Sequence, residues 1–262
     1  MPGREARPIR EAMSDEFEGP RTAIVTGGAR RIGAEIVRAL AADGWHVLIH
    51  CHRSHAEAEA LAAELGSASI VRAELADPEA AARILSAADG LPPLRLLVNS
   101  ASRFVYDSAG DFSLEGWNAH FDVNLRAPAL LSQAFAVRAE KGLIVNLLDA
   151  KLCQPNPDFF TYTISKMGLA GLTELLARAL APRIRVCAIA PSVTLVSGPQ
   201  SRDNFEQVHK MNALGRGVEA ADIVAALRFI LAAPVLTGQT ITLDGGQRFL
   251  ALPRDVQFME PR

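Results

Sequence analysis

The segment TAIVTGGARRIG occupies positions 22–33 and joins an apolar run, a glycine-rich turn and the start of a helical pattern. Residues 22–26 predict a buried strand, because all of them are apolar or β-branched. From Ile32 onward apolar residues recur at helical spacing, and Gly44 ends the predicted helix. Glycines at such a turn let the backbone approach a pyrophosphate, and the helix N-terminus supplies unpaired N–H groups with partial positive charge. The segment therefore favours a phosphate-binding turn, although an ordinary tight strand-to-helix connection also uses glycine.

Apolar runs alternate with Ala-rich helical segments along the rest of the chain. Further strands are expected at residues 46–50, 69–73, 94–98, 143–148, 184–190 and 239–243. Further helices are expected at residues 56–65, after Pro78, and at 119–138, 160–180 and 220–231, with residues 191–218 irregular. This alternation predicts an α/β fold, a single Rossmann-type doubly wound parallel sheet of about seven strands with helices on both faces.

Composition excludes several classes of protein. The 262 residues carry 27 basic and 29 acidic side chains, a net charge of -2, so no basic excess indicates a nucleic-acid or acidic-membrane partner. No uncharged, uninterrupted run reaches the roughly 18 residues of a membrane span. Three scattered cysteines favour neither a disulfide framework nor a metal site. We expect a cytoplasmic protein, in a compartment that keeps its cysteines reduced, and no bound metal.

The expected domain organisation is simple. Residues 1–20 interleave Arg and Glu with Pro and Gly and predict a disordered tail without a secretory signal. Residues 21–250 show no internal repeat or linker and predict one domain. Residues 251–262 are expected to form a C-terminal tail.

The end of the second predicted strand indicates which dinucleotide binds. Folds that prefer NAD place an acid about 20 residues after the turn, to hold the ribose 2′-hydroxyl. Here the strand runs into Arg53 and Ser54, which suit a 2′-phosphate, and Arg30 at the first turn is placed to approach the same group. NADP(H) is therefore favoured over NAD, the alternative being a solvated basic strand end.

Two later strand ends complete the predicted cofactor site, because ligands of parallel sheets bind at the carboxyl ends of strands. Glu74 and Leu75 follow the third strand, where an acid is suited to accept a hydrogen bond from the adenine amino group. Asn99, Ser100 and Ala101 follow the fourth, and their small side chains let a cofactor lie against the strand ends.

Candidate catalytic residues follow the fifth predicted strand. Tyr162 and Lys166 lie one helical turn apart on one face, and a cation beside a phenol is expected to lower the pKa of the phenol. Tyr162 is then a candidate proton donor to a substrate that has received a hydride. Asp149, thirteen residues before Tyr162, either begins a turn or orients substrate amino groups and relays a proton.

Together these motifs resemble the short-chain dehydrogenase/reductase family along residues 21–248. The resemblance rests on the turn at 26–33, the 99–101 segment, Asn124, the Tyr162-x-x-x-Lys166 pair and the 243–246 segment LDGG. Three positions depart from the general family pattern: Arg31 replaces a glycine of the turn, Ser102 replaces a glycine, and Asp149 replaces a serine. These replacements are similar to the pteridine reductase and dihydromonapterin reductase branch.

The resemblance implies roles for matching positions. His52, Arg53 and Ser54 would hold the NADPH 2′-phosphate, and Gly27, Arg30, Arg31 and Ile32 would line the phosphate turn. Arg31 would also bridge to a pterin carbonyl, Ser102 would bond cofactor and pterin, and Phe104, which is alternatively plain core, would stack on the pterin. Lys166 would hold the nicotinamide ribose, Asn124 would support the local helix and a proton-relay water, and Thr194 would contact cofactor or ligand. A homotetramer and a substrate lid within residues 191–218 are also implied.

Three functions remain open at this point. The favoured one is an NADPH-dependent pterin reductase, in which Asp149, Arg31 and Phe104 converge to form a slot for a bicyclic nitrogen heterocycle. The alternatives are a carbonyl reductase of ketones or 3-oxoacyl thioesters, and a non-catalytic NADP-binding sensor. The intact Tyr162 and Lys166 favour an enzyme over a sensor.

Overall fold

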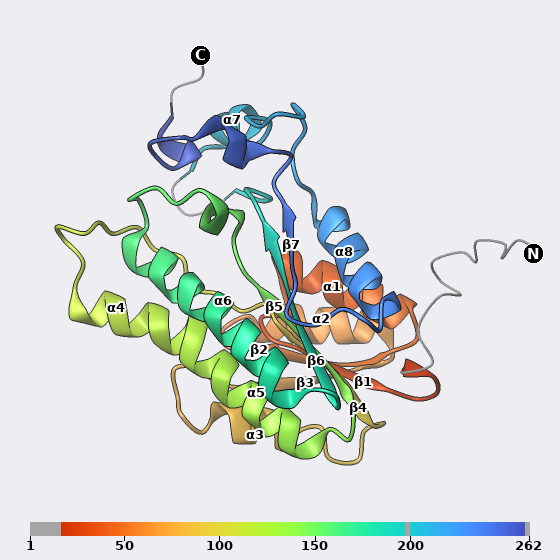
Figure 1. Ribbon diagram of the computed structural model, residues 1–262. Helices are drawn as coiled ribbons and strands as arrows, with labels where there is room; N and C mark the ends of the chain where they lie inside the picture. The colour runs from red at the N-terminus through yellow and green to blue at the C-terminus, as the bar shows by residue number, and fades with distance from the viewer. Residues whose placement is uncertain (1–16, 197–199, 260–262) are drawn as a thin grey trace, which may run out of the picture.

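A computed structural model describes residues 17–196 and 200–259. Seven parallel strands form one sheet in the order β3-β2-β1-β4-β5-β6-β7 (Figure 1). The strands are β1 (Thr22–Val25), β2 (His46–Cys51), β3 (Ala68–Arg72), β4 (Leu94–Asn99), β5 (Gly142–Leu147), β6 (Ile184–Pro191) and β7 (Thr240–Leu243). The order reverses between β1 and β4, which is where doubly wound sheets bind their ligands. The predicted α/β fold is confirmed.

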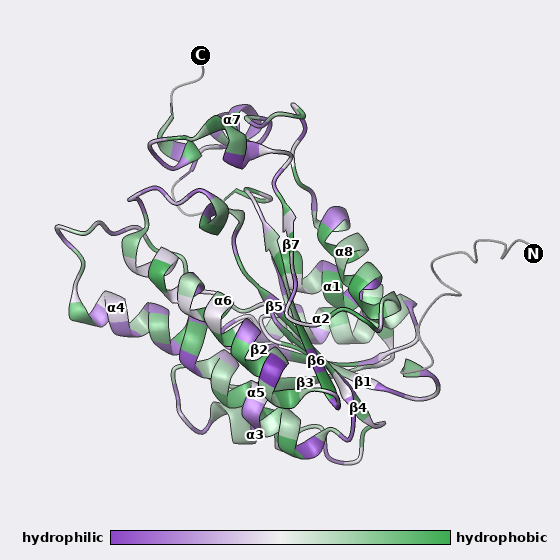
Figure 2. Cartoon of the chain, viewed as in Figure 1, coloured by the Kyte–Doolittle hydropathy of each residue, from purple (hydrophilic) through white to green (hydrophobic). Residues whose placement is uncertain are grey.

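Helices cover both faces of the sheet. They are α1 (Arg31–Ala42), α2 (His55–Leu65), α3 (Ala80–Ser86), α4 (Leu114–Phe121), α5 (Ala127–Arg138), α6 (Phe160–Leu180), α7 (Arg202–Val208) and α8 (Ala220–Ala232). One hydrophobic cluster packs α1, α2 and α8 on one face, and a second packs α3, α5 and α6 on the other. Figure 2 shows the apolar strands at the centre and hydrophilic residues on the outer sides of the helices.

Helix boundaries differ from the sequence expectation in three places. The helix expected at 119–138 begins at Leu114, because Ser113 caps it by accepting a hydrogen bond from the Gly116 N–H at 3.0 Å. It then passes through a π-helical turn, Asp122–Arg126, before α5. The helix expected to open at Pro78 begins two residues later, at Ala80. Residues 191–218, expected to be irregular, contain α7, which Ser201 caps by accepting from the Asn204 N–H at 3.1 Å.

The described chain ends also depart from the expected tails. Phe17 is 1% exposed and its ring centre lies 5.5 Å from that of Trp45, so the tail predicted to run to residue 20 is wrong at Phe17. At the other end Val256 is buried and Arg254 pairs with Asp158 at 2.7 Å. The expected C-terminal tail therefore folds onto the domain, near α7 in Figure 1. Among the described residues, no helix is both long and apolar enough to span a lipid bilayer.

Candidate active site

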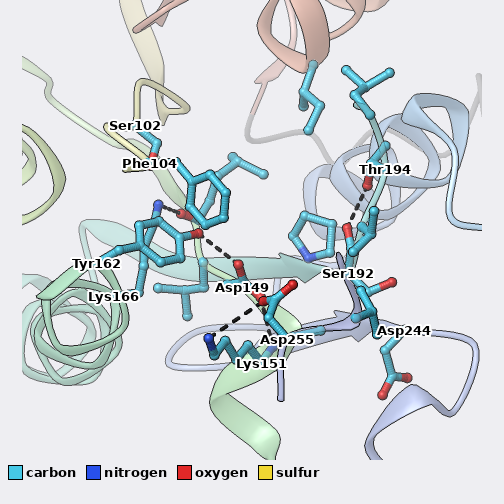
Figure 3. A pocket seen from close by; sticks show the side chains of 18 of the residues that line it. Ser102, Phe104, Asp149, Lys151, Tyr162, Lys166, Ser192, Thr194, Asp244 and Asp255 are labelled. Carbon is cyan, nitrogen blue, oxygen red and sulfur yellow. Dashed lines mark hydrogen bonds and ion pairs between the residues drawn. The ribbon is translucent and has the colours of Figure 1, made fainter. Parts of the chain in front are cut away.

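A cavity of about 580 Å³ opens at the carboxyl ends of the central strands (Figure 3). It contains many of the residues predicted from sequence: Gly27, Arg30, Arg31, Ile32, Ser100, Ala101, Ser102, Phe104, Asp149, Tyr162, Lys166 and Thr194. His52, Arg53, Ser54, Glu74, Leu75, Asn99 and Asn124 lie outside its lining. No group of three His, Cys, Asp or Glu side chains in the described ranges is placed to hold a metal ion.

The turn before α1 has the backbone that a phosphate requires. A Cβ on Gly33 would lie 2.2 Å from the Gly27 carbonyl oxygen, so only glycine lets strand and helix approach this closely. Arg30, the residue that precedes α1, makes no side-chain hydrogen bond to the first helical turn, and that turn contains no acidic residue. Its N–H groups and the partial positive charge of the helix therefore suit a pyrophosphate.

Arg31 adopts a backbone conformation that glycine usually supplies. Its φ is 56°, in the left-handed region that costs a residue with a side chain roughly 1–2 kcal/mol. The sequence departs from the general family pattern at this same position, where glycine is replaced. A strained arginine that lines the cavity is the kind of outlier that marks a functional position.

His50, for which the sequence indicated no role, braces the turn. Its Nδ1 accepts a hydrogen bond from the Gly27 N–H at 3.2 Å, and its Nε2 lies 3.1 Å from the Ala73 carbonyl oxygen. This pattern requires the neutral ring with the proton on Nε2, because Nδ1 is the acceptor. Burial lowers the pKa of His50 to about 4, which keeps the ring neutral near pH 7. The signal, a histidine inside a buried strand beside the turn, was visible in the sequence but has no distinctive spacing.

The groups predicted to hold the adenosine half lie at the ends of β2 and β3. His52 Nε2 is 2.7 Å from Glu74 Oε2, so two residues assigned to different parts of the cofactor contact each other. The Arg30 guanidinium nitrogen Nη1 lies 3.6 Å from Glu57 Oε1, and the Arg53 side chain is exposed. The Leu75 side chain is buried in the core beneath α3, which leaves only its backbone for a ligand.

The segment after β4 is held by Thr26. The Thr26 hydroxyl oxygen accepts hydrogen bonds from the N–H groups of Ser100 and Ala101 at 3.0 and 3.1 Å. Asn99 is buried, and its side chain donates to Asn146 Oδ1 at 2.8 Å instead of lining the cavity. The cofactor contact predicted for Asn99 stays a prediction, and only its backbone is left for that contact, because Asn146 of β5 binds the side chain.

Asn124 is a positioning residue in the π-helical turn. Its Oδ1 accepts from the Arg103 N–H at 2.8 Å and from Ser102 Oγ at 3.3 Å, and its Nδ2 donates to Ser165 Oγ at 3.0 Å. These bonds tie the segment that carries Ser102 and Phe104 to α6. Asn124 is fully buried outside the cavity lining, so it acts here through its neighbours.

Tyr162, Asp149 and Lys166 meet in the cavity. The Tyr162 hydroxyl donates to Asp149 Oδ2 at 2.8 Å, and Asp149 Oδ1 accepts from the Lys151 N–H at 2.8 Å. Lys166 Nζ donates to the Leu147 carbonyl at 2.7 Å and lies 5.8 Å from the centre of the Tyr162 ring. Tyr162 and Lys166 are both buried.

The expected lowering of the Tyr162 pKa is wrong for this arrangement. Burial and the adjacent Asp149 carboxylate raise the pKa of the phenol well above its ordinary value. Both effects disfavour phenolate, and the Lys166 ammonium donates its hydrogen bond to the Leu147 carbonyl. Burial lowers the pKa of Lys166 to about 8, while Asp149 opposes that shift. Near pH 7 Tyr162 is therefore a protonated phenol hydrogen-bonded to a carboxylate.

Phe104 lies at the same cavity as Asp149 and Arg31. Its ring stacks on Phe159 at 4.1 Å between centres. It meets the Tyr162 ring edge-on at 4.7 Å (Figure 3). The Phe104 side chain remains 37% exposed, so it is not plain core. Stacking of a ligand on Phe104 stays a prediction, and Phe159 was missed because it is distant from Phe104 in the chain.

The charged residues of the site that were not predicted include Lys151, Asp158, Arg254 and Asp255. Lys151, Arg254 and Asp255 line the cavity, and Asp158 is buried beside it. Asp158 lies 96 positions before Arg254 in the chain, so local spacing gave no indication that they pair. On the opposite side of the cavity, Thr194 Oγ1 donates to the Ser192 carbonyl at 2.8 Å.

Comparison with known proteins decides the family. The family model described as short chain dehydrogenase matches residues 21–207. The chain belongs to the short-chain dehydrogenase family. It is thus an oxidoreductase with a small-molecule substrate, and NADP-bound structures similar to it support NADP(H) as its cofactor.

Similar proteins in this family carry different names. The structure of FolM alternative dihydrofolate reductase 1 from Brucella canis, complexed with NADP, is 40% identical, with a TM-score of 0.84 over 92% of this chain and 96% of that one. L-xylulose reductase of Mesocricetus auratus is 33% identical over 86% of this chain and 96% of its own. The 3-oxoacyl-[acyl-carrier-protein] reductase of Synechocystis is 29% identical over the same shares.

For this short-chain dehydrogenase the turnover rate is expected to fall as the pH rises through about 8, because Lys166 loses its positive charge there. Below that pH the ammonium is present, whereas the Tyr162 proton is retained on both sides of it. The measurement is kcat at saturating NADPH and substrate from about pH 6 to about pH 10, with thermal stability followed in parallel. A level profile across that range would contradict the assignment.

Proposed function

We propose that the protein is an NADPH-dependent reductase of pterin-type substrates, most simply 7,8-dihydromonapterin or dihydrofolate. The supporting observation is one cavity lined by Arg31, Phe104 and Asp149, in which Asp149 is hydrogen-bonded to Tyr162. A pterin is a flat heterocycle with amino and ring N–H groups beside a carbonyl. An aromatic ring, a carboxylate and a guanidinium are the side chains that complement those three features.

In this proposal, residues at the carboxyl ends of the strands would hold the cofactor. Gly27, Arg30, Arg31 and Ile32 hold its phosphates, and His52, Arg53 and Ser54 hold the 2′-phosphate. Glu74, Leu75, Asn99, Ser100, Ala101 and Thr194 line the adenine and nicotinamide ends, Asn99 through its backbone, because its side chain faces Asn146. When bound, NADPH supplies a hydride to a ring carbon of the substrate.

The chain's own residues then supply the proton that completes the reduction of a C=N bond. Tyr162 delivers or relays a proton to the nitrogen that adjoins the reduced carbon, since its hydroxyl is protonated and faces the cavity. Asp149 holds the hydroxyl in position and accepts from substrate N–H groups. Lys166 holds the nicotinamide ribose, Ser102 bonds to cofactor and pterin, and Phe104 stacks on the pterin.

Relatives support a second candidate. L-xylulose reductase and 3-oxoacyl-[acyl-carrier-protein] reductase both act on carbonyl groups by name, so a carbonyl reductase is the alternative. A ketone, however, needs only a proton on oxygen. The carboxylate at position 149, where the general family pattern has a serine, suits a substrate that presents N–H groups. The sensor alternative is disfavoured, because Tyr162 and Asp149 form a hydrogen-bonded pair within the cavity.

The test is an assay of purified protein with NADPH and two substrate classes. We expect oxidation of NADPH in the presence of 7,8-dihydromonapterin or dihydrofolate, and much slower oxidation with a sugar ketone or a 3-oxoacyl thioester. Rapid reduction of a ketone without turnover of either dihydropterin would overturn the proposal in favour of the carbonyl reductase.

We also propose that the protein assembles as a homotetramer through α5 and α6. Val137 and Leu175 on these helices are 83% and 66% exposed, so their apolar side chains are available to contact a neighbouring subunit. Light scattering of the purified chain gives its mass in solution, and a monomer would refute this assembly.

A further inference from the structure

The C-terminal segment, residues 252–258, forms one wall of the active-site cavity. It is attached through Asp158, whose carboxylate accepts from Arg254 Nε at 2.7 Å and from the Asp255 N–H at 2.8 Å. Val256 is buried beneath the segment. These contacts place the Asp255 side chain beside Asp149 (Figure 3).

Lys151 joins the two carboxylates. Its N–H donates to Asp149 Oδ1 at 2.8 Å, and its ammonium lies 3.6 Å from Asp255 Oδ2. The ammonium also donates to the Asp158 carbonyl. With a side chain only 8% exposed, Lys151 is a fixed part of the cavity wall rather than a mobile surface lysine.

The two carboxylates retain capacity to bind a ligand. Within the described residues, Asp149 accepts from Tyr162 and from the Lys151 N–H, and Asp255 contacts the Gln257 N–H and Lys151 Nζ. Each carboxylate oxygen thus has one such partner but two lone pairs. The remaining lone pairs suit a ligand edge that donates hydrogen bonds.

We propose that Asp255 is a specificity-determining residue, whose carboxylate forms with Asp149 a two-carboxylate edge that accepts hydrogen bonds from the amino and ring N–H groups of the substrate. This inference rests on the proposed pterin reductase function and identifies a further residue of the same site. Burial raises the pKa of Asp255 and the Asp149 carboxylate adds to that shift, while Lys151 and the Gln257 N–H oppose it.

The decisive variant is Asp255→Asn, which keeps the shape of the side chain and removes its charge. We expect KM for the dihydropterin to rise about tenfold, because a charge-assisted hydrogen bond is lost. kcat and the affinity for NADPH should change by less than about twofold, since Tyr162 and the phosphate turn are untouched. Asp89→Asn, a distant carboxylate whose side chain is 67% exposed, is the matched control and should leave all three values unchanged.

Equilibrium binding separates recognition of the amino edge from a general effect on the cavity. Pterin and lumazine differ at the 2-position, which carries an amino group in pterin and a carbonyl in lumazine. In the presence of NADP, the unmodified protein should prefer pterin, and Asp255→Asn should lose about fivefold or more of that preference. A preference equal to that of the unmodified protein would overturn the inference.

The outcomes distinguish the two proposals. If the unmodified protein reduces dihydropterins and Asp255→Asn has the same KM and the same ligand preference, the inference fails and the proposed function stands. If the unmodified protein does not reduce dihydropterins, both fail. Asp255→Ser retains a hydroxyl to accept from the Gln257 N–H and serves as the second variant. Loss of folding in both variants would make Asp255 a structural residue and overturn the inference.

Discussion

Tyr162→Phe is expected to reduce kcat by about 10³-fold while NADPH affinity changes by less than about twofold. The substitution removes the hydroxyl that donates to Asp149 and leaves the buried ring in place beside Lys166. Substrate still binds, but the proton donor is gone. Single-turnover kinetics with NADPH and a dihydropterin, combined with titration of NADPH by protein fluorescence, measure the two effects separately.

The chain offers a matched control for this variant. Tyr106 is the only other tyrosine in the sequence, and it is 46% exposed at the edge of the aromatic group formed with Phe159 and Phe258. Tyr106→Phe removes a phenol hydroxyl without touching Asp149 and should retain nearly full turnover. Equal turnover rates for Tyr162→Phe and the unmodified protein would remove Tyr162 from the reaction.

Asp149→Ser is expected to exchange one activity for another. Pterin reduction should fall by about 10²-fold or more, because the carboxylate that accepts from Tyr162 and from substrate N–H groups is lost. Ketone reduction should rise, since serine restores the usual hydroxyl of the general family pattern beside a tyrosine whose pKa is no longer raised by the Asp149 carboxylate. The measurement is kcat/KM for a dihydropterin and for a ketone with the same enzyme preparation.

Local stability is preserved in this variant, which makes the result interpretable. Asp149 also caps a short 3-10 turn, Ala150–Cys153, by accepting from the Lys151 N–H, and serine is a good residue at that position. Asp149→Asn serves as the control for charge alone and should lose pterin reduction without gaining as much ketone reduction. Retention of pterin kcat/KM within about twofold in Asp149→Ser would contradict the proposed role of this carboxylate.

Much of the site was predictable because its residues follow strand ends. Gly27, Ser100 and Asp149 come within two residues of the ends of β1, β4 and β5, which are neighbours in the sheet, so they line one cavity. Such a prediction places backbone positions and not side-chain directions. Asn99 illustrates the limit: it ends β4 as expected, yet its side chain faces Asn146 in the core.

Local patterns in the chain determine the doubly wound sheet, the glycine turn and the Tyr162–Lys166 pair, because strand and helix periodicity and one-turn spacing are properties of neighbouring residues. Burial and contacts between distant segments decide the rest. The tautomer of His50 depends on Gly27 and Ala73, its neutral ring depends on burial, and the raised pKa of Tyr162 depends on its burial against Asp149. Asp255 enters the cavity only because Asp158, 97 positions earlier, anchors its backbone. The local sequence pattern determines which helices and strands form. The packing of those elements then determines the electrostatic environment of each side chain and which distant residues pair.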